Sequence, residues 1–203
     1  MVNELQRIIS AFIQILFIIL LPSIWWFVTV RGKVPFMEWI GLKAVKRDKV
    51  SYLITWIIGG FLLFTAFSIF IFPLTRSIET ATSAFSGMGL KALPSILIYS
   101  FLQTSLPEEL LFRGFLLKRL VNHMPFVFAN TIQAIAFGLL HGVLFASVVS
   151  LEVTFFIIFF TGAIAAYLGF VNEKKAGGSI LTSWIIHALA NILSGLVAAF
   201  SLF

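Results

Sequence analysis

The sequence contains no cysteine, and only 11% of its 203 residues are charged. Without cysteine there is no disulfide, thiolate metal ligand or cysteine nucleophile, so the three histidines and eight carboxylates become the main candidates for chemistry. Apolar residues make up 60% of the chain, and the mean hydropathy is +1.07. A water-soluble domain of this size carries far more polar surface. The composition therefore predicts a membrane protein.

Acidic residues are scarcer than basic ones, which gives a formal net charge of +6. In a soluble protein this excess would suggest binding to nucleic acid. In a membrane protein, basic residues instead set the topology and contact anionic lipids. We therefore expect the lipid bilayer, and no nucleic acid, as a partner.

Long apolar runs recur along the whole chain. A transmembrane helix needs about 20 predominantly apolar residues, and six segments meet this requirement: 8–30, 51–72, 93–117, 125–145, 147–170 and 179–202. The first is too long for a signal-peptide core and lacks a small-residue cleavage pattern, so we expect it to remain as an anchor. The sequence predicts an all-α fold, a polytopic membrane bundle of about six transmembrane helices in a single domain over residues 1–203.

Two longer gaps separate these apolar segments. Residues 31–50 mix aromatic, apolar and basic side chains, a composition typical of a short helix in the membrane interface. Residues 73–92 form the second candidate, and Gly87 and Gly89 predict a break before the third span. We expect one or two interfacial helices from these gaps.

Lysine and arginine divide unequally between the two sides of a six-span bundle. The side with the first, third and fifth loops receives ten of them: Arg31, Lys33, Lys43, Lys46, Arg47, Lys49, Lys118, Arg119, Lys174 and Lys175. The other side receives three: Arg7, Arg76 and Lys91. Because cytosolic loops of membrane proteins are enriched in Lys and Arg, we expect these three loops in the cytosol and both termini outside.

Ionisable residues that fall well inside the predicted spans include Glu108, Glu109, Arg113, His141 and His187. Each costs at least about 2.5–3.5 kcal/mol to place in a bilayer, so such residues indicate function and need partners. Glu109 and Arg113 are four residues apart and can form an intrahelical ion pair. Glu108 has no such partner on its own helix, so we expect it to meet the two histidines.

Each histidine shares a helical face with residues at four-residue spacing: Gln133, Phe137 and His141 lie on one face, and Ser183, His187 and Asn191 on another. At 1.5 Å per residue, Glu108 and His187 lie about 15 and 13 Å from the cytosolic ends of their spans, whereas His141 lies about 25 Å along its helix. His141 is therefore expected to join them only if its helix is tilted or begins below the membrane surface.

Three motifs follow one another on separate predicted helices. Residues 108–113 fit E-E-x-x-x-R, residues 137–141 fit F-x-x-x-H, and residues 187–191 fit H-x-x-x-N. In this order they resemble the CPBP family of intramembrane proteases, which includes type II CAAX prenyl endopeptidases, or Ras-converting-enzyme-like proteins, and bacterial relatives (Abi proteins) linked to bacteriocin processing or immunity. The motif region covers residues 99–195. The resemblance implies a multi-pass integral protein of a bacterial plasma membrane.

The resemblance also implies a catalytic role for each motif residue: Glu108 and His141 activate a water molecule, His187 and Asn191 polarise the scissile carbonyl and hold the oxyanion, and Glu109 and Arg113 support them. The implied substrate is a membrane-associated protein or peptide, which is prenylated for a true CAAX protease. These residue roles agree with the chemistry of peptide hydrolysis, which needs a general base and hydrogen-bond donors aimed at the developing negative charge.

The family is often described as metalloproteases, which makes zinc a candidate cofactor. Glu108, His141 and His187 are the three residues that could hold it and leave one position open for water. The H-E-x-x-H zinc signature is absent from the sequence, and aligned His and Glu side chains can also activate water without a metal. The sequence leaves metal dependence and oligomeric state open.

Other designs fit the sequence less well. Asp48 is the only aspartate, which excludes an aspartyl dyad. A serine design would pair Ser179, which follows two glycines, with His187. Outside proteolysis, the chain could be a non-catalytic scaffold or bacteriocin-immunity protein that regulates a membrane partner, or a small transporter with a proton relay. The intact motif residues favour a protease over a scaffold, and a transporter would more often show internal repeats.

Overall fold

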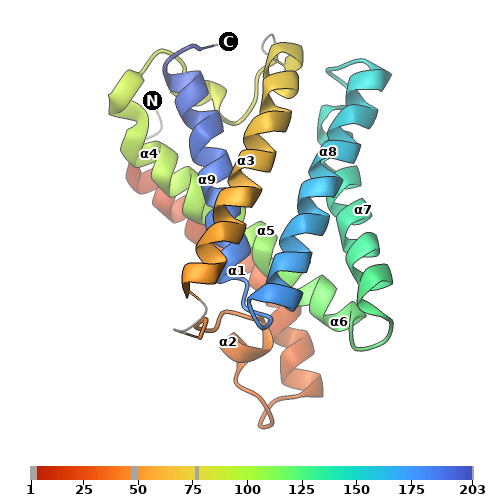
Figure 1. Ribbon diagram of the computed structural model, residues 1–203. Helices are drawn as coiled ribbons and strands as arrows, with labels where there is room; N and C mark the ends of the chain where they lie inside the picture. The colour runs from red at the N-terminus through yellow and green to blue at the C-terminus, as the bar shows by residue number, and fades with distance from the viewer. Residues whose placement is uncertain (1–3, 47–49, 76–77, 203) are drawn as a thin grey trace.

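The computed structural model describes residues 4–46, 50–75 and 78–202 (Figure 1). Within these ranges the chain forms helices and turns and no strand, which confirms the predicted all-α class. Five helical segments are long and apolar enough to cross a membrane: α1 (Glu4–Thr29), α3 (Val50–Thr75), α7 (Phe126–Phe145), α8 with its π-helical extension η6 (Leu151–Lys175 together) and α9 (Leu181–Ala199). They correspond to five of the six predicted spans, so the chain is a polytopic helical bundle.

The remaining predicted span, residues 93–117, is helical but irregular. It passes through α4 (Leu93–Ile98), η4 (Tyr99–Ser105), α5 (Leu106–Glu108), η5 (Glu109–Leu117) and α6 (Lys118–Leu120), of which η4 and η5 are π-helical. Pro107 lies at their junction and lacks the N–H that a regular helical turn needs. Short π-helical segments are frequent at functional sites, and this stretch carries the E-E-x-x-x-R motif.

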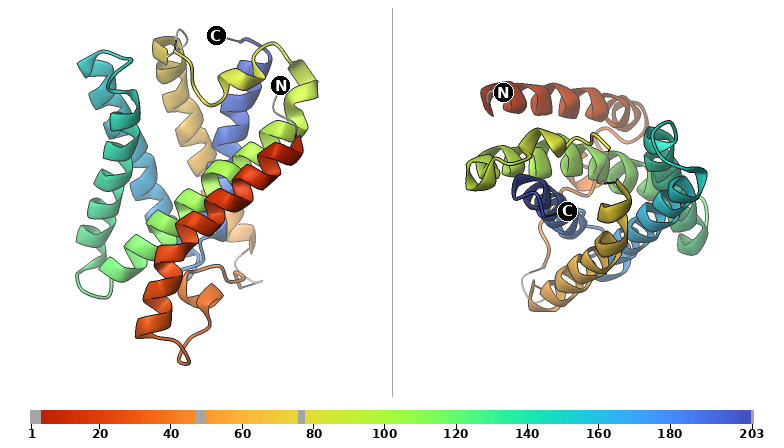
Figure 2. Two further views of the ribbon diagram at one scale, coloured as in Figure 1. Left: turned by 180° about the vertical axis from the view of Figure 1, so that it is seen from behind. Right: turned by 90° about the horizontal axis from the view of Figure 1, so that it is seen from above.

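The two described chain ends lie at the same end of the bundle, which we call the terminal end (Figure 1). The opposite end holds the loop after α1, the turn between α6 and α7, and the turn before α9 (Figures 1 and 2). We call it the basic end, because eight described basic residues belong to it: Arg31, Lys33, Lys43, Lys46, Lys118, Arg119, Lys174 and Lys175. At the terminal end, α7 and α8 stand apart from α1 and α4 (Figure 2).

The two segments expected at the interface contain little α-helix. In residues 31–50 the described part holds only α2 (Phe36–Trp39), a single turn, and residues 47–49 lie outside the described ranges. In residues 73–92, α3 continues to Thr75, and residues 78–92 contain two 3₁₀ turns, η2 (Ser83–Phe85) and η3 (Gly89–Ala92). Residues 76–77 are not described. The segment folds against the bundle because Phe85 is fully buried in a cluster with Ile96 and Ala199.

Glycines bring α7 and α8 into close contact. Gly138 and Gly142 have the small-x-x-x-small spacing that lets membrane helices approach each other. A Cβ atom on Gly138 would lie 2.5 Å from the Ile158 carbonyl oxygen, and one on Gly142 would overlap the Ile158 side chain. The backbone of α8 therefore leaves no room for a side chain at Gly138, and the Ile158 side chain fills that space at Gly142.

We expect Gly138→Ala to lower the free energy of unfolding by about 1–3 kcal/mol, because the added methyl group meets backbone atoms that cannot move aside alone. Gly162→Ala is a matched control at the same interface, where the new Cβ would lie 3.3 Å from Ala134 O. The two variants are compared by their midpoints of thermal unfolding in detergent. A midpoint for Gly138→Ala no lower than that of Gly162→Ala would contradict this packing.

Candidate active site

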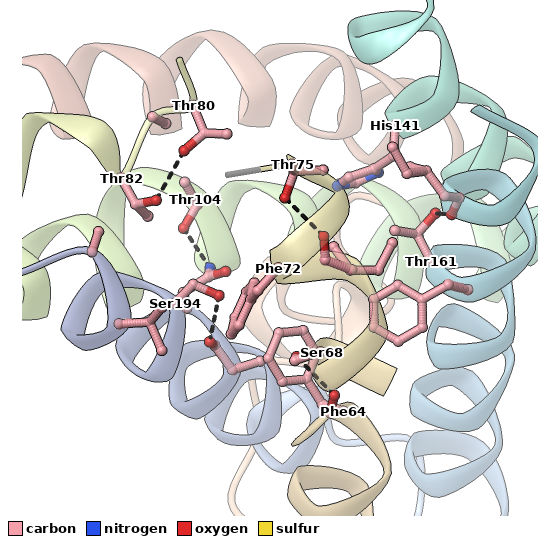
Figure 3. A pocket seen from close by; sticks show the side chains of 18 of the residues that line it. Phe64, Ser68, Phe72, Thr75, Thr80, Thr82, Thr104, His141, Thr161 and Ser194 are labelled. Carbon is pink, nitrogen blue, oxygen red and sulfur yellow. Dashed lines mark hydrogen bonds between the residues drawn. The ribbon is translucent and has the colours of Figure 1, made fainter. Parts of the chain in front are cut away.

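Four polar motif residues line one cavity of about 550 Å³ in the middle of the bundle. Glu108 comes from α5, His141 from α7, and His187 and Asn191 from α9. Side chains of α3 and α8 complete the wall, and Figure 3 shows His141 among them. Residues far apart in the sequence therefore share one enclosed space.

Glu108 lies beside both histidines. Its Oε2 atom is 3.7 Å from His187 Nε2 and 4.0 Å from His141 Nε2. The same oxygen is buried and accepts no hydrogen bond from any described residue. The separations are too long for direct hydrogen bonds but suit a bridging water molecule. The expected meeting of Glu108 with the two histidines is thus present in the structure.

His141 reaches Glu108 although it lies farther along its helix. Side chains lean toward the N-terminus of their own helix. Because α7 starts at the basic end, His141 leans toward that end, whereas Glu108 belongs to a stretch that runs the opposite way and leans toward the terminal end (Figure 1). The two side chains therefore lean toward each other. This lean shortens the separation that the helical rise along the backbone alone would give.

Hydrogen bonds fix one nitrogen of each histidine ring. The Nδ1 atom of His141 is 2.9 Å from the Phe137 carbonyl oxygen, which can only accept, so Nδ1 carries the hydrogen. The Nδ1 atom of His187 is 3.0 Å from Glu109 Oε1 and likewise donates. In both rings Nε2 faces Glu108 and is an acceptor when the imidazole is neutral.

Glu109 is fully buried and forms the centre of a polar network behind the cavity. Its Oε1 atom lies 3.0 Å from Arg113 Nη1 and 3.0 Å from His187 Nδ1, and its Oε2 atom accepts a hydrogen bond from Ser183 Oγ. The ion pair with Arg113 and the hydrogen bonds from His187 and Ser183 favour the ionised carboxylate. The predicted ion pair between Glu109 and Arg113 is therefore present, and it also holds His187 in orientation.

Arg113 is fully buried and stacks on an aromatic ring. Its guanidinium carbon lies 4.4 Å from the centroid of the Phe137 ring. The centroid of the same ring is 4.4 Å from that of His141. Phe137, the first residue of the F-x-x-x-H motif, thus packs between a cation and a histidine, and the cation–π contact helps to stabilise a buried guanidinium.

Two residues outside the motifs complete the hydrogen-bond network. Asn172, from η6, is fully buried and donates from Nδ2 to Ser183 Oγ at 2.6 Å. Thr104, from η4, accepts a hydrogen bond from Asn191 Nδ2 at 2.7 Å. The four-residue spacing between Thr104 and Glu108 could have revealed Thr104. Asn172 gives no such signal, because in the sequence it precedes the charged residues of an expected loop.

Two residues considered from the sequence lie elsewhere. Gln133 shares a helical face with His141, but its Nε2 donates to Ala165 O at 2.9 Å and links α7 to α8. Ser179 donates from Oγ to the Lys43 carbonyl oxygen at 2.7 Å and does not line the cavity. Because its hydroxyl is bonded away from His187, the serine design receives no support.

No group of three His, Cys, Asp or Glu side chains in the described parts of the chain is placed to hold a metal ion. Zinc ligands 2.0–2.2 Å from the ion in tetrahedral geometry lie about 3.4 Å apart. The carboxylate of Glu108 is more distant than this from both imidazoles, at 3.7 and 4.0 Å. As placed, Glu108, His141 and His187 do not form a zinc centre, and zinc stays a prediction.

Comparison with protein families gives one match. The model for the Rce1-like family, described as type II CAAX prenyl endopeptidase Rce1-like, matches residues 90–193, just over half of the chain. This range contains all three motifs and the residues of the polar network around them. Searches of curated proteins and of solved structures found no significant match.

Proposed function

The chain belongs to the Rce1-like family of type II CAAX prenyl endopeptidases, and from this premise we propose that it hydrolyses a peptide bond in a membrane-associated protein or peptide. The observation that carries the proposal is the convergence of Glu108 with the Nε2 atoms of His141 and His187 in one cavity. A carboxylate between two imidazoles can take a proton from water and deliver it to a leaving amine.

Glu108 and His141 are the groups proposed to activate the water. A water molecule between Glu108 Oε2 and His141 Nε2 can donate one hydrogen bond to each. As its oxygen attacks the carbonyl carbon, Glu108 accepts one proton and later passes it to the nitrogen of the departing amine. The bond from His141 Nδ1 to the Phe137 carbonyl keeps Nε2 free to accept.

His187 and Asn191 are the donors proposed for the oxyanion. His187 Nδ1 donates to the Glu109 carboxylate, which orients the ring so that Nε2, when it also carries a proton, can donate to the substrate. Asn191 uses one amide hydrogen on Thr104, which leaves its second hydrogen for the substrate. Donors of this kind typically contribute about 2.7–4 kcal/mol each to the transition state.

Proteolysis can be tested before any substrate has been identified. Protein N- and C-termini are compared across the proteome of cells that carry the wild-type chain or Glu108→Gln, at equal membrane levels. Termini that disappear in the variant would support the proposal and identify the substrates. Unchanged termini, with the wild-type phenotype retained by the variant, would refute it and favour the non-catalytic scaffold or immunity protein.

We expect Thr104→Val to lower kcat about 10–100-fold with a smaller change in KM, because the Asn191 amide loses the partner that orients it. Thr104→Ser keeps the hydroxyl and is expected to retain most of the activity. The measurement is steady-state cleavage of a peptide that spans a site found in the proteome comparison. Equal losses in Thr104→Val and Thr104→Ser would argue against the hydroxyl and for a packing role.

A further inference from the structure

The cavity extends from the proposed catalytic residues toward the terminal end. Its wall there includes Ser86, after α3, Phe145, at the end of α7, and Ser201, after α9. No described residue from the loops at the basic end, residues 30–46, 118–125 or 171–180, contributes to the wall. The opening therefore lies on the side of the two termini.

Packed side chains close the basic end below the site. Ile40, Leu110 and Ile180 form a cluster whose members are at most 1% exposed. Lys118, beside them in the fold, donates from Nζ to Glu173 Oε1 at 2.8 Å and to the Gly178 carbonyl at 2.7 Å, which joins the loops around this cluster. A peptide that approached from the basic end would have to displace these contacts.

The cavity wall is almost free of charge. No Lys or Arg lies among its described residues, and Glu108 is the only carboxylate there. Away from Glu108, His141 and His187, a charged substrate side chain or a terminal carboxylate would therefore find no counter-ion along the wall, at high cost within a bilayer. The wall is selective for an uncharged stretch of peptide.

Hydroxyl groups replace charges near the opening. Thr80, Thr82, Thr104 and Ser194 line the cavity, and Figure 3 shows them grouped on one side of it. A peptide that unwinds for cleavage exposes backbone N–H and C=O groups that find no partner in lipid. Hydroxyl groups both donate and accept hydrogen bonds, so this side of the cavity suits an extended backbone.

The distribution of basic residues gives the cavity a direction in the membrane. Eight described lysines and arginines belong to the basic end, against Arg7 and Lys91 at the terminal end. By the positive-inside rule the basic end faces the cytosol.

We propose that the cavity receives an uncharged, extended peptide segment from the non-cytosolic face of the membrane. This inference rests on the proposed function. It makes exported membrane-associated peptides the substrate class, instead of protein tails exposed in the cytosol.

The absence of cysteine makes the orientation directly measurable, because the wild-type chain gives no background with thiol reagents. Ser86→Cys places a thiol at the opening, and Asn122→Cys places one in the exposed turn between α6 and α7. Intact cells are treated with a membrane-impermeant maleimide, before or after permeabilisation. We expect Ser86→Cys to react in intact cells and Asn122→Cys to react only after permeabilisation.

A second arm links access to cleavage. Ala198→Cys is a small change in the wall of the cavity, on the part of α9 beyond the proposed catalytic residues. We expect the impermeant reagent, added to intact cells, to stop formation of the termini that depend on Glu108. Asn122→Cys treated in the same way is the control and should keep its activity.

The two experiments distinguish a wrong face of entry from the absence of protease activity. Labelling of Asn122→Cys in intact cells, with Ser86→Cys protected, would overturn the proposed face of entry even if cleavage is real. Continued cleavage by fully labelled Ala198→Cys would overturn the cavity as the route of the substrate. If no protein termini depend on Glu108, the protease is refuted, while the labelling pattern still tests the orientation.

Discussion

Glu108→Gln is expected to cleave the substrate of the wild-type protein about 10²–10⁴-fold more slowly, the usual contribution of a general base. The amide cannot accept the proton that the attacking water must lose. The side chain keeps its size, and Oε2 accepts no hydrogen bond from the described residues, so the replacement breaks no internal contact. We therefore expect the free energy of unfolding to stay close to that of the wild type.

The rate and the unfolding midpoint are both measured on purified protein in detergent, with a peptide that spans a mapped cleavage site. Glu152→Gln is the matched control, because Glu152 is an exposed carboxylate at the start of α8 and does not line the cavity. It should cleave at the wild-type rate. A Glu108→Gln protein that is folded and as active as this control would remove Glu108 from the mechanism.

The membrane spans are predictable from the sequence because bilayer thickness imposes a length on every apolar run. The polar residues of the site are predictable for the related reason that each is costly in lipid. Glu108 and the pair Glu109–Arg113 stand out on that criterion alone. The ion pair and the proximity of Glu108 to both histidines follow from helical spacing and from the need for partners, and both are present.

Other parts of the site depend on tertiary packing and are not visible in the sequence. Asn172 reads as part of a loop, yet a π-helical extension of α8 buries it against Ser183. The reach of His141 depends on the opposite directions of two helices. The segment 78–92 is polar enough for the membrane surface, but the burial of Phe85 draws it onto the bundle.

The largest loss of stability is expected for Arg113→Met. Methionine keeps most of the volume but leaves the fully buried Glu109 carboxylate without its cation, and breaking a buried pair in this way typically costs about 3–5 kcal/mol. Glu109→Gln combined with Arg113→Met removes both charges, so the double variant should be more stable than Arg113→Met alone. The double variant should nevertheless be inactive, because His187 Nδ1 has lost the carboxylate that orients its ring.

Unfolding midpoints of the wild type, the two single variants and the double variant form a double-mutant cycle that isolates the coupling between the two residues. Lys118→Met serves as the control, because its ion pair with Glu173 is partly exposed and should contribute less. If the losses of the two single variants simply add in the double variant, the pair is not coupled and does not hold the site together. Recovery of stability without recovery of cleavage would instead separate the two roles of Glu109, neutralising a buried cation and orienting the histidine that faces the substrate.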